Sequence, residues 1–201
     1  MPQTCARLGL FGGSFDPVHR AHLALARTAL VELQLDRLLW LPAGHAWQKA
    51  RALTPAVHRL AMLGLALADE PRFVVDPRET QRAGPSYTLE TVLELRAEQP
   101  QARLFLIIGQ DQYAGLHTWH GCAQLLQQVA LAVAVRPGAP PTADAAVRGH
   151  PVQWLTLPPT SVAATDIRQC VARGASIEDL VPPEVARYIE SHGLYQGRSR
   201  S

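Results

Sequence analysis

The sequence predicts an α/β protein with a doubly wound, mainly parallel sheet and a small C-terminal helical subregion. Short runs that are apolar throughout alternate with stretches of about 10 to 15 residues in which apolar side chains recur at helical spacing. Strands that are apolar on both faces are typical of a parallel sheet covered by helices on both sides. The polar motifs follow directly after predicted strands, at the strand ends where such folds bind ligands.

Six apolar runs are predicted to be strands, and glycine or proline follows several of them. These strands are Arg7–Phe11, Arg37–Leu41, Phe73–Val75, Arg103–Ile108, Val129–Val135 and Val152–Leu157. Six stretches have helical periodicity, namely His22–Leu33, Pro55–Asp69, Thr88–Glu98, Ala123–Gln128, Thr165–Arg173 and Pro183–His192. Gly174 and Gly193 are predicted to end the last two helices, since glycine adopts the left-handed conformation that commonly follows a helix. The proline-rich stretch 137–151 is predicted to be a loop.

The length of 201 residues predicts a single domain. Residues 7–160 would form the α/β core, 161–195 the C-terminal helices and 196–201 a disordered tail. The net charge of +2 is too small to indicate a nucleic-acid or membrane partner. Three scattered cysteines, the lack of a signal peptide and the lack of a spanning apolar run favour a reducing, cytoplasmic location. The sequence leaves open whether the protein is a monomer or a homodimer.

The stretch Gly12–Ala26, "GGSFDPVHRAHLALA", joins the first predicted strand to the first predicted helix. A glycine-rich turn before a helix binds anions well, because backbone N–H groups and the helix dipole both favour negative charge. The chain has no Walker A lysine, so His19 and His22 are the candidate phosphate ligands. At a spacing of three residues, both rings can lie on one face of the first helical turn. Such N–H donors can stabilise the charge that develops on a phosphoryl group during transfer.

Two other interpretations of this stretch are open. His19 and His22 could form half of a metal site together with Asp16. Alternatively they could be structural, with His19 bonded into the turn and His22 packed beneath the loop.

Two ordered motifs resemble the nucleotidylyltransferase superfamily, which has a Rossmann-like fold. The stretch "GLFGGSFDPVHRAHL" resembles its N-terminal signature, with Ala21 in place of the usual glycine. The stretch "SVAATDIRQCVARG" resembles its I-S-S-T-x-I-R motif, with Ala163 and Ala164 in place of the two serines. The resemblance implies that Gly12, Gly13, Ser14 and Phe15 form the turn that binds ATP and that His19 and His22 contact its phosphates.

The second motif begins a predicted helix. Thr165 is expected to cap this helix, and Arg168 is expected to reach the β- and γ-phosphates with its guanidinium. Arg168 as a solvated helix residue is the alternative.

The segments Ala83–Arg96, Phe105–Gly121 and Val133–Gly138 resemble the bacterial nicotinate mononucleotide adenylyltransferases. The resemblance runs from Leu8 to Tyr195 and implies transfer of AMP from ATP to nicotinate mononucleotide, giving deamido-NAD and pyrophosphate. It also implies Mg²⁺ held mainly by the ATP phosphates, without a dedicated protein site. The preference for nicotinate over nicotinamide mononucleotide is left open.

The same resemblance implies a role for each of several residues. Trp119 would stack on the pyridine ring, while Thr88 and the backbone amides near Trp119 and His120 would receive the nicotinate carboxylate. A core or rim position for Trp119 and a helix-capping role for Thr88 are the alternatives.

The remaining implied positions belong to the ATP side. Gly109 would let adenine approach, and Asp111 would bond a ribose or orient the loop, or else be a plain turn residue. Lys49 would reach the triphosphate when its loop closes, or else be an exposed lysine. Arg136 would contact a phosphate.

Three hypotheses compete with this one. The acceptor could be nicotinamide mononucleotide or another phosphate ester. The chain could be a nucleotide-binding module without catalysis, since both serines of the second motif are lost. It could also be a metal hydrolase that uses Asp16, His19 and His22.

Overall fold

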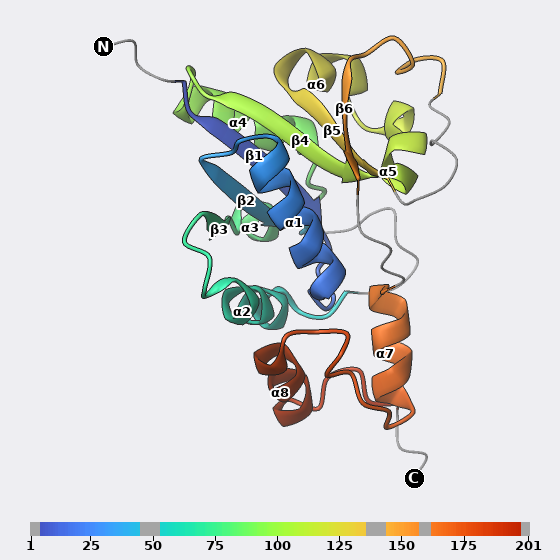
Figure 1. The fold of residues 1–201 in the computed structure, drawn as a ribbon. Helices are drawn as coiled ribbons and strands as arrows, with labels where there is room; N and C mark the ends of the chain where they lie inside the picture. Colours follow the sequence, from blue (N-terminus) through green and yellow to red (C-terminus); the bar gives the residue numbers. More distant parts are fainter. Residues whose placement is uncertain (1–4, 45–52, 136–143, 157–161, 198–201) are drawn as a thin grey trace.

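The computed structural model describes residues 5–44, 53–135, 144–156 and 162–197 (Figure 1). Its centre is a six-stranded sheet in the order β3-β2-β1-β4-β5-β6, in which every neighbouring pair is parallel. All six predicted strands are confirmed, as β1 (Arg7–Gly13), β2 (Arg37–Pro42), β3 (Phe73–Val75), β4 (Arg103–Gly109), β5 (Ala130–Val135) and β6 (Val152–Thr156).

The order of the strands fixes where a ligand can bind. The chain runs outward from β1 to β2 and β3, and then returns to add β4 on the other side of β1. The carboxyl ends of β1 and β4 therefore lie at the point where the direction of winding reverses, which is where doubly wound sheets open a crevice.

Two apolar clusters cover the two faces of the sheet. Side chains alternate between the faces along each strand, so Phe105 and Ile107 of β4 point into one cluster while Leu104 and Leu106 point into the other. The first cluster contains α1 (Arg20–Glu32), α2 (Ala56–Leu67), α7 (Ala164–Ala172) and α8 (Pro183–Ser191). The second contains α4 (Thr88–Glu98), α5 (Gln110–Ala114) and α6 (Cys122–Gln128).

The helices differ from the prediction in three ways. Helix α1 begins at Arg20, two residues before the predicted start, which makes His19 its N-cap residue. Helix α7 begins at Ala164 with Ala163 as N-cap, so the expectation that Thr165 caps it is wrong. The short helices α3 (Arg78–Gln81), α5 and the 3₁₀ helix η1 (Leu116–Thr118) were not predicted.

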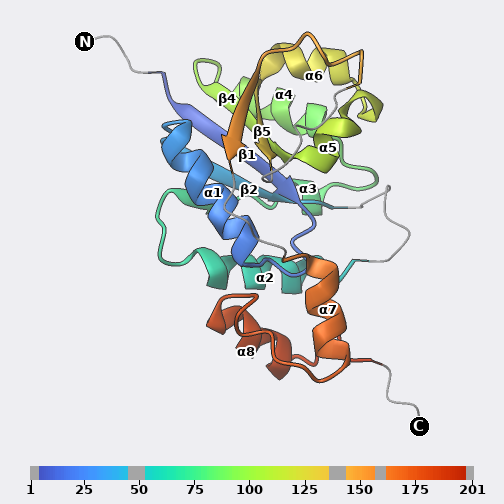
Figure 2. The same ribbon diagram turned by 45° about the vertical axis from the view of Figure 1, so that its right-hand side comes forward.

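The C-terminal helices pack beside α2, at the end of the sheet from which the turn after β1 emerges (Figures 1 and 2). Gly174 and Gly193 follow α7 and α8 with φ of 71° and 59°, which confirms their predicted role in ending these helices. Within the described part of the chain, no helix combines the length and the apolar character needed to cross a bilayer.

Candidate active site

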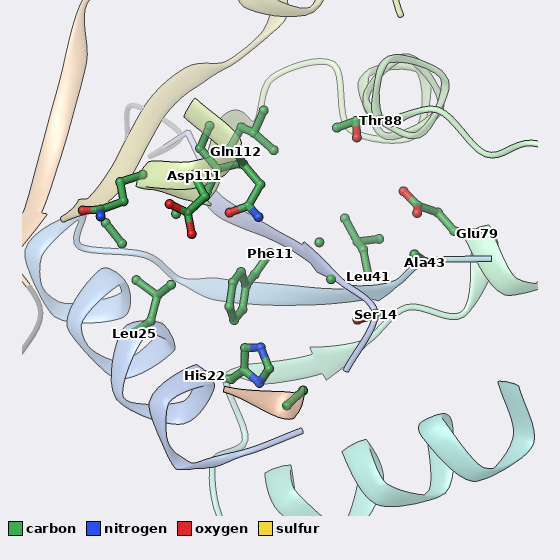
Figure 3. Close-up of a pocket in the computed structure, with 18 of the residues that line it drawn as sticks. Phe11, Ser14, His22, Leu25, Leu41, Ala43, Glu79, Thr88, Asp111 and Gln112 are labelled. Carbon is green, nitrogen blue, oxygen red and sulfur yellow. The ribbon is translucent and has the colours of Figure 1, made fainter. Parts of the chain in front are cut away.

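A cavity of about 520 Å³ lies at the carboxyl ends of β1 and β4 (Figure 3). It brings together segments that are far apart in the sequence. Ten of the predicted site residues line it: Gly12, Gly13, Ser14, His19, His22, Thr88, Gly109, Asp111, Trp119 and His120. Ala163 and Ala164, from the second motif, line it as well.

The two imidazoles stack on each other at the start of α1. Their ring centroids are 3.6 Å apart and the ring planes differ by 20°, which confirms that both lie on one face of the first turn. The backbone N–H of His19 donates to Nδ1 of His22 over 3.3 Å. In this bond Nδ1 of His22 is the acceptor, so the other ring nitrogen, Nε2, is the one suited to donate. Phe11 and Phe15 hold the other sides of the His22 ring, at centroid distances of 6.0 and 5.1 Å.

His19 is the more deeply buried of the pair, with 6% of its surface exposed. Burial lowers its pKa from 6.5 to about 4, since the charged form loses its hydration. His19 is therefore uncharged near neutral pH. The pair therefore does not place two positive charges at the start of α1.

The second motif, which contains Thr165 and Arg168 of α7, contacts the turn after β1. Nη1 of Arg168 donates to the carbonyl oxygen of Asp16 over 2.7 Å, and Nη2 donates to Oγ1 of Thr165 over 3.0 Å. Neither Arg168 nor Thr165 is among the residues that line the cavity, although Ala164 beside them is. Arg168 is half-buried, so it differs from the solvated helix residue that was the alternative.

An aromatic wall borders another part of the cavity. Tyr87 and His120 stack with ring centroids 4.4 Å apart. Trp119 is half-buried and packs on the edge of the second apolar cluster, so part of the indole belongs to the core and part faces the cavity. Tyr87, not Thr88, is the N-cap residue of α4, so the capping alternative for Thr88 is wrong.

Asp111 and Thr88 lie on different sides of the cavity, and His22 lies below and between them (Figure 3). Gly109 ends β4 and is followed by Asp111 and Gln112 in α5. A Cβ atom on Gly109 would meet Oε1 of Gln112 at 2.8 Å, so the end of that flexible side chain would have to move.

Sequence reasoning missed several lining residues. Glu79, Ser86, Tyr87, Gln110 and Gln112 all line the cavity. Glu79 is the most unusual of them, because its carboxyl group is buried and accepts a hydrogen bond of 2.8 Å from the Thr91 hydroxyl. Burial raises the pKa of Glu79 above its usual value. Its only sequence signal was an acidic side chain shortly before the segment Ala83–Arg96.

One predicted site residue, Phe15, does not line the cavity as expected, and two others lie outside the described ranges. Phe15 is 1% exposed and packs under His22 and Trp40, so it supports the turn from the core and is not among the lining residues. Lys49 and Arg136 lie outside the described residues.

Among the described residues, the arrangement of side-chain donors does not fit a protein-held metal. Within residues 5–44, 53–135, 144–156 and 162–197, no group of three His, Cys, Asp or Glu side chains could hold a metal ion. The carboxylate of Asp16 accepts bonds from the Tyr195 hydroxyl and the Thr54 N–H. The metal-hydrolase interpretation of Asp16, His19 and His22 therefore has no support in this geometry.

Comparison with known proteins places this geometry in context. A model of the cytidylyltransferase-like family matches residues 10–170. The chain is 49% identical over 195 residues to a probable nicotinate-nucleotide adenylyltransferase of Albidiferax ferrireducens, covering 94% of this chain and 98% of the relative. It is 47% identical over 195 residues to one of Methylibium petroleiphilum, covering 94% and 92%.

Solved structures share the fold at low sequence identity. A Plasmodium falciparum nicotinic acid mononucleotide adenylyltransferase complexed with APC superposes with a TM-score of 0.77 at 15% identity, over 94% of this chain and 97% of that one. The same enzyme complexed with NaAD gives a TM-score of 0.77 at 17% identity, with the same coverage.

Proposed function

This chain belongs to the nicotinate-nucleotide adenylyltransferase family within the cytidylyltransferase-like proteins, and we propose that it transfers AMP from ATP to nicotinate mononucleotide. The products are deamido-NAD and pyrophosphate, so the reaction is a step in NAD biosynthesis.

One observation carries the proposal. A single cavity combines a paired-imidazole turn, suited to phosphates, with a separate aromatic wall, suited to a pyridine ring. A module that bound only one nucleotide would not need the aromatic wall in addition to the paired-imidazole turn. A cavity of about 520 Å³ is also within the range of sites that hold small-molecule ligands.

The chemistry is a direct displacement at phosphorus. A phosphate oxygen of the mononucleotide attacks the α-phosphorus of ATP while the bond from this phosphorus to the β-bridging oxygen breaks. Pyrophosphate leaves with that electron pair. No covalent enzyme intermediate is needed, so the protein acts by positioning the reactants and stabilising charge.

His19, His22 and Arg168 would supply the charge stabilisation. His22, whose Nδ1 accepts the His19 N–H, would donate from its ring to a phosphoryl oxygen. Arg168 approaches from the far side of the same turn, where a guanidinium with five N–H donors can bind the β- and γ-phosphates. Gly12, Gly13 and Ser14 would let the backbone approach the triphosphate closely. Lys49 and Arg136 complete the proposed ATP-binding set.

The acceptor would bind against the aromatic wall. Trp119 would stack on the pyridine ring, and the Thr88 hydroxyl with the amides near His120 would receive the nicotinate carboxylate. Asp111 and Gly109, across the cavity, would then contact the adenosine part of ATP.

Mg²⁺ would enter with ATP and be held mainly by phosphate and water oxygens, since the described residues offer no three-ligand site for it. When bound, it would neutralise charge on the phosphates. The side chains of this chain would still set the position of the two substrates.

The direct test is pyrophosphate release with Mg-ATP and three acceptors in parallel, with the products identified by mass spectrometry. The acceptors are nicotinate mononucleotide, nicotinamide mononucleotide and phosphopantetheine. Rapid release with the nicotinate form and a product of the mass of deamido-NAD is expected. Release with another acceptor alone would contradict the acceptor assignment, and no release with any acceptor would favour a binding module.

A further inference from the structure

The carboxylate of Asp16 is held from two sides by segments that lie outside the cavity. The Tyr195 hydroxyl donates to Oδ1 over 2.7 Å, and the backbone N–H of Thr54 donates to Oδ2 over 3.2 Å. Asp16 is 1% exposed, so water cannot replace a lost donor at this position. A buried carboxylate that loses one of its donors must find another or become unstable.

Asp16 also connects the two phosphate motifs. It lies three residues before His19, in the turn between β1 and α1. Its carbonyl oxygen accepts the 2.7 Å hydrogen bond from Nη1 of Arg168. The position of Asp16 therefore affects both the turn between β1 and α1 and the place where the guanidinium of Arg168 is anchored.

Tyr195 comes from the segment after α8, near the end of the described chain. Burial, together with the hydrogen bond to Asp16, raises the pKa of the Tyr195 hydroxyl well above its usual value, so it remains a donor at neutral pH. The residue has φ of 62°, in the left-handed region that bulky residues rarely adopt. Such a conformation persists only where surrounding contacts hold it.

We infer that Tyr195 is a positioning residue for the ATP triphosphate, acting through Asp16 on Arg168 and on the turn that carries His19. This inference rests on the proposed function for the identity of the ligand. When the hydroxyl is lost, the Asp16 carboxylate loses one of its donors, and the backbone of Asp16, which anchors Arg168, is held less firmly. Arg168 and the turn that carries His19 would then be less well placed for the phosphates.

Tyr195→Phe tests this with the loss of a single oxygen atom, and Tyr188→Phe is the matched control. Tyr188 lies on α8 and its hydroxyl contacts Nδ1 of His58 over 3.0 Å, away from Asp16. Binding of a non-hydrolysable ATP analogue is measured by calorimetry without any mononucleotide. Tyr195→Phe is expected to raise the Kd about 10-fold, by losing a hydrogen bond to a charged group, while Tyr188→Phe leaves it unchanged.

Two further measurements separate positioning from simple loss of stability. In an Arg168→Ala background, Tyr195→Phe should have a smaller effect on the Kd than in the wild-type protein, because part of its effect acts through Arg168. In the wild-type protein, the analogue should slow hydrogen exchange at residues 194–197, since coupling between two sites is reciprocal. This second measurement needs no variant to fold.

The opposite results would overturn the inference. These are an unchanged Kd in Tyr195→Phe, additive effects with Arg168→Ala, or unchanged exchange at residues 194–197 in the wild-type protein. Failure of the proposed function has a different signature, because a Tyr195 effect on ATP binding without transfer to nicotinate mononucleotide would contradict the acceptor chemistry alone.

Discussion

At the residue scale, the two imidazoles at the start of α1 are held by different means. His22 is half-buried, packs against two phenylalanine rings and has its tautomer set by the His19 N–H. His19 is buried and uncharged because it is desolvated. Removing His22 should therefore affect mainly the chemistry, whereas removing His19 should also change how stability depends on pH.

His22→Ala should lower the turnover number by about 10²-fold or more, as the loss of one donor to a developing oxyanion does. Steady-state kinetics with both substrates saturating measures this directly. His150→Ala, which changes a histidine outside the cavity lining, is the control and should keep normal turnover. Full activity in His22→Ala would show that its phosphate role is wrong.

His19 should make the protein less stable in mild acid. Between pH 6.5 and about 4, the unfolded chain binds a proton at His19 that the folded protein excludes. The free energy of unfolding should therefore fall as the pH decreases through this window, by up to about 1.4 kcal/mol per pH unit. His19→Asn, which keeps a good N-cap residue, should flatten this dependence in urea unfolding measured from pH 4 to 7. Equal slopes for wild type and variant would contradict the assignment.

Trp119→Ala should raise the KM for the mononucleotide and leave the KM for ATP nearly unchanged, because the indole borders only the proposed acceptor half. Loss of one stacked aromatic is expected to cost about 1 kcal/mol of binding, or roughly fivefold in KM. Trp154→Ala is the matched control, since Trp154 is exposed on the edge strand β6. Unchanged mononucleotide kinetics in Trp119→Ala would remove the stacking role.

At the element scale, the segment after β2 fits closely against α3. A Cβ atom on Gly44 would overlap the carbonyl oxygen of Glu79, and this backbone cannot move aside as a flexible side chain can. Gly64, in α2, is exposed, and no atom lies within 4 Å of the place its Cβ would take.

The same substitution should therefore have opposite effects at these two glycines. Gly44→Ala should lower the free energy of unfolding by about 1–3 kcal/mol through overpacking. Gly64→Ala should raise it by about 0.5–1 kcal/mol, because alanine is the better helix former. Urea unfolding of both variants checks this, and equal midpoints would show that the contact between Gly44 and Glu79 is not tight.

The elements that could be predicted from sequence are those with a continuous apolar signal. The six strands were found because each is an apolar run, yet β1 extends through Gly12 and Gly13, which pair with β2 through backbone alone. The short helices α3 and α5 have no long periodic pattern to reveal them. Glu79 and Tyr87 reach the cavity only through the packing of α3 and α4 against the strand ends, which no local pattern encodes. His19 and His22 were found because their turn follows a strand directly.

At the scale of the whole molecule, the sheet order explains how one cavity can hold two nucleotides. The winding reverses between β1 and β4, so the turn after β1 and the helix after β4 diverge and leave an opening at the centre of the sheet. The C-terminal helices pack on the same apolar cluster as α1 and α2, which brings Arg168 and Tyr195 to the turn. Segments from the N-terminal and C-terminal parts of the chain thus contribute to one site.

A crystal structure with deamido-NAD bound tests the central claim most directly, because this product carries both halves of the reaction. We expect phosphate oxygens within hydrogen-bond distance of His22, the pyridine ring stacked on Trp119 and the adenosine part beside Gly109 and Asp111. A product bound in the reverse direction, or with its phosphates away from the turn after β1, would contradict it.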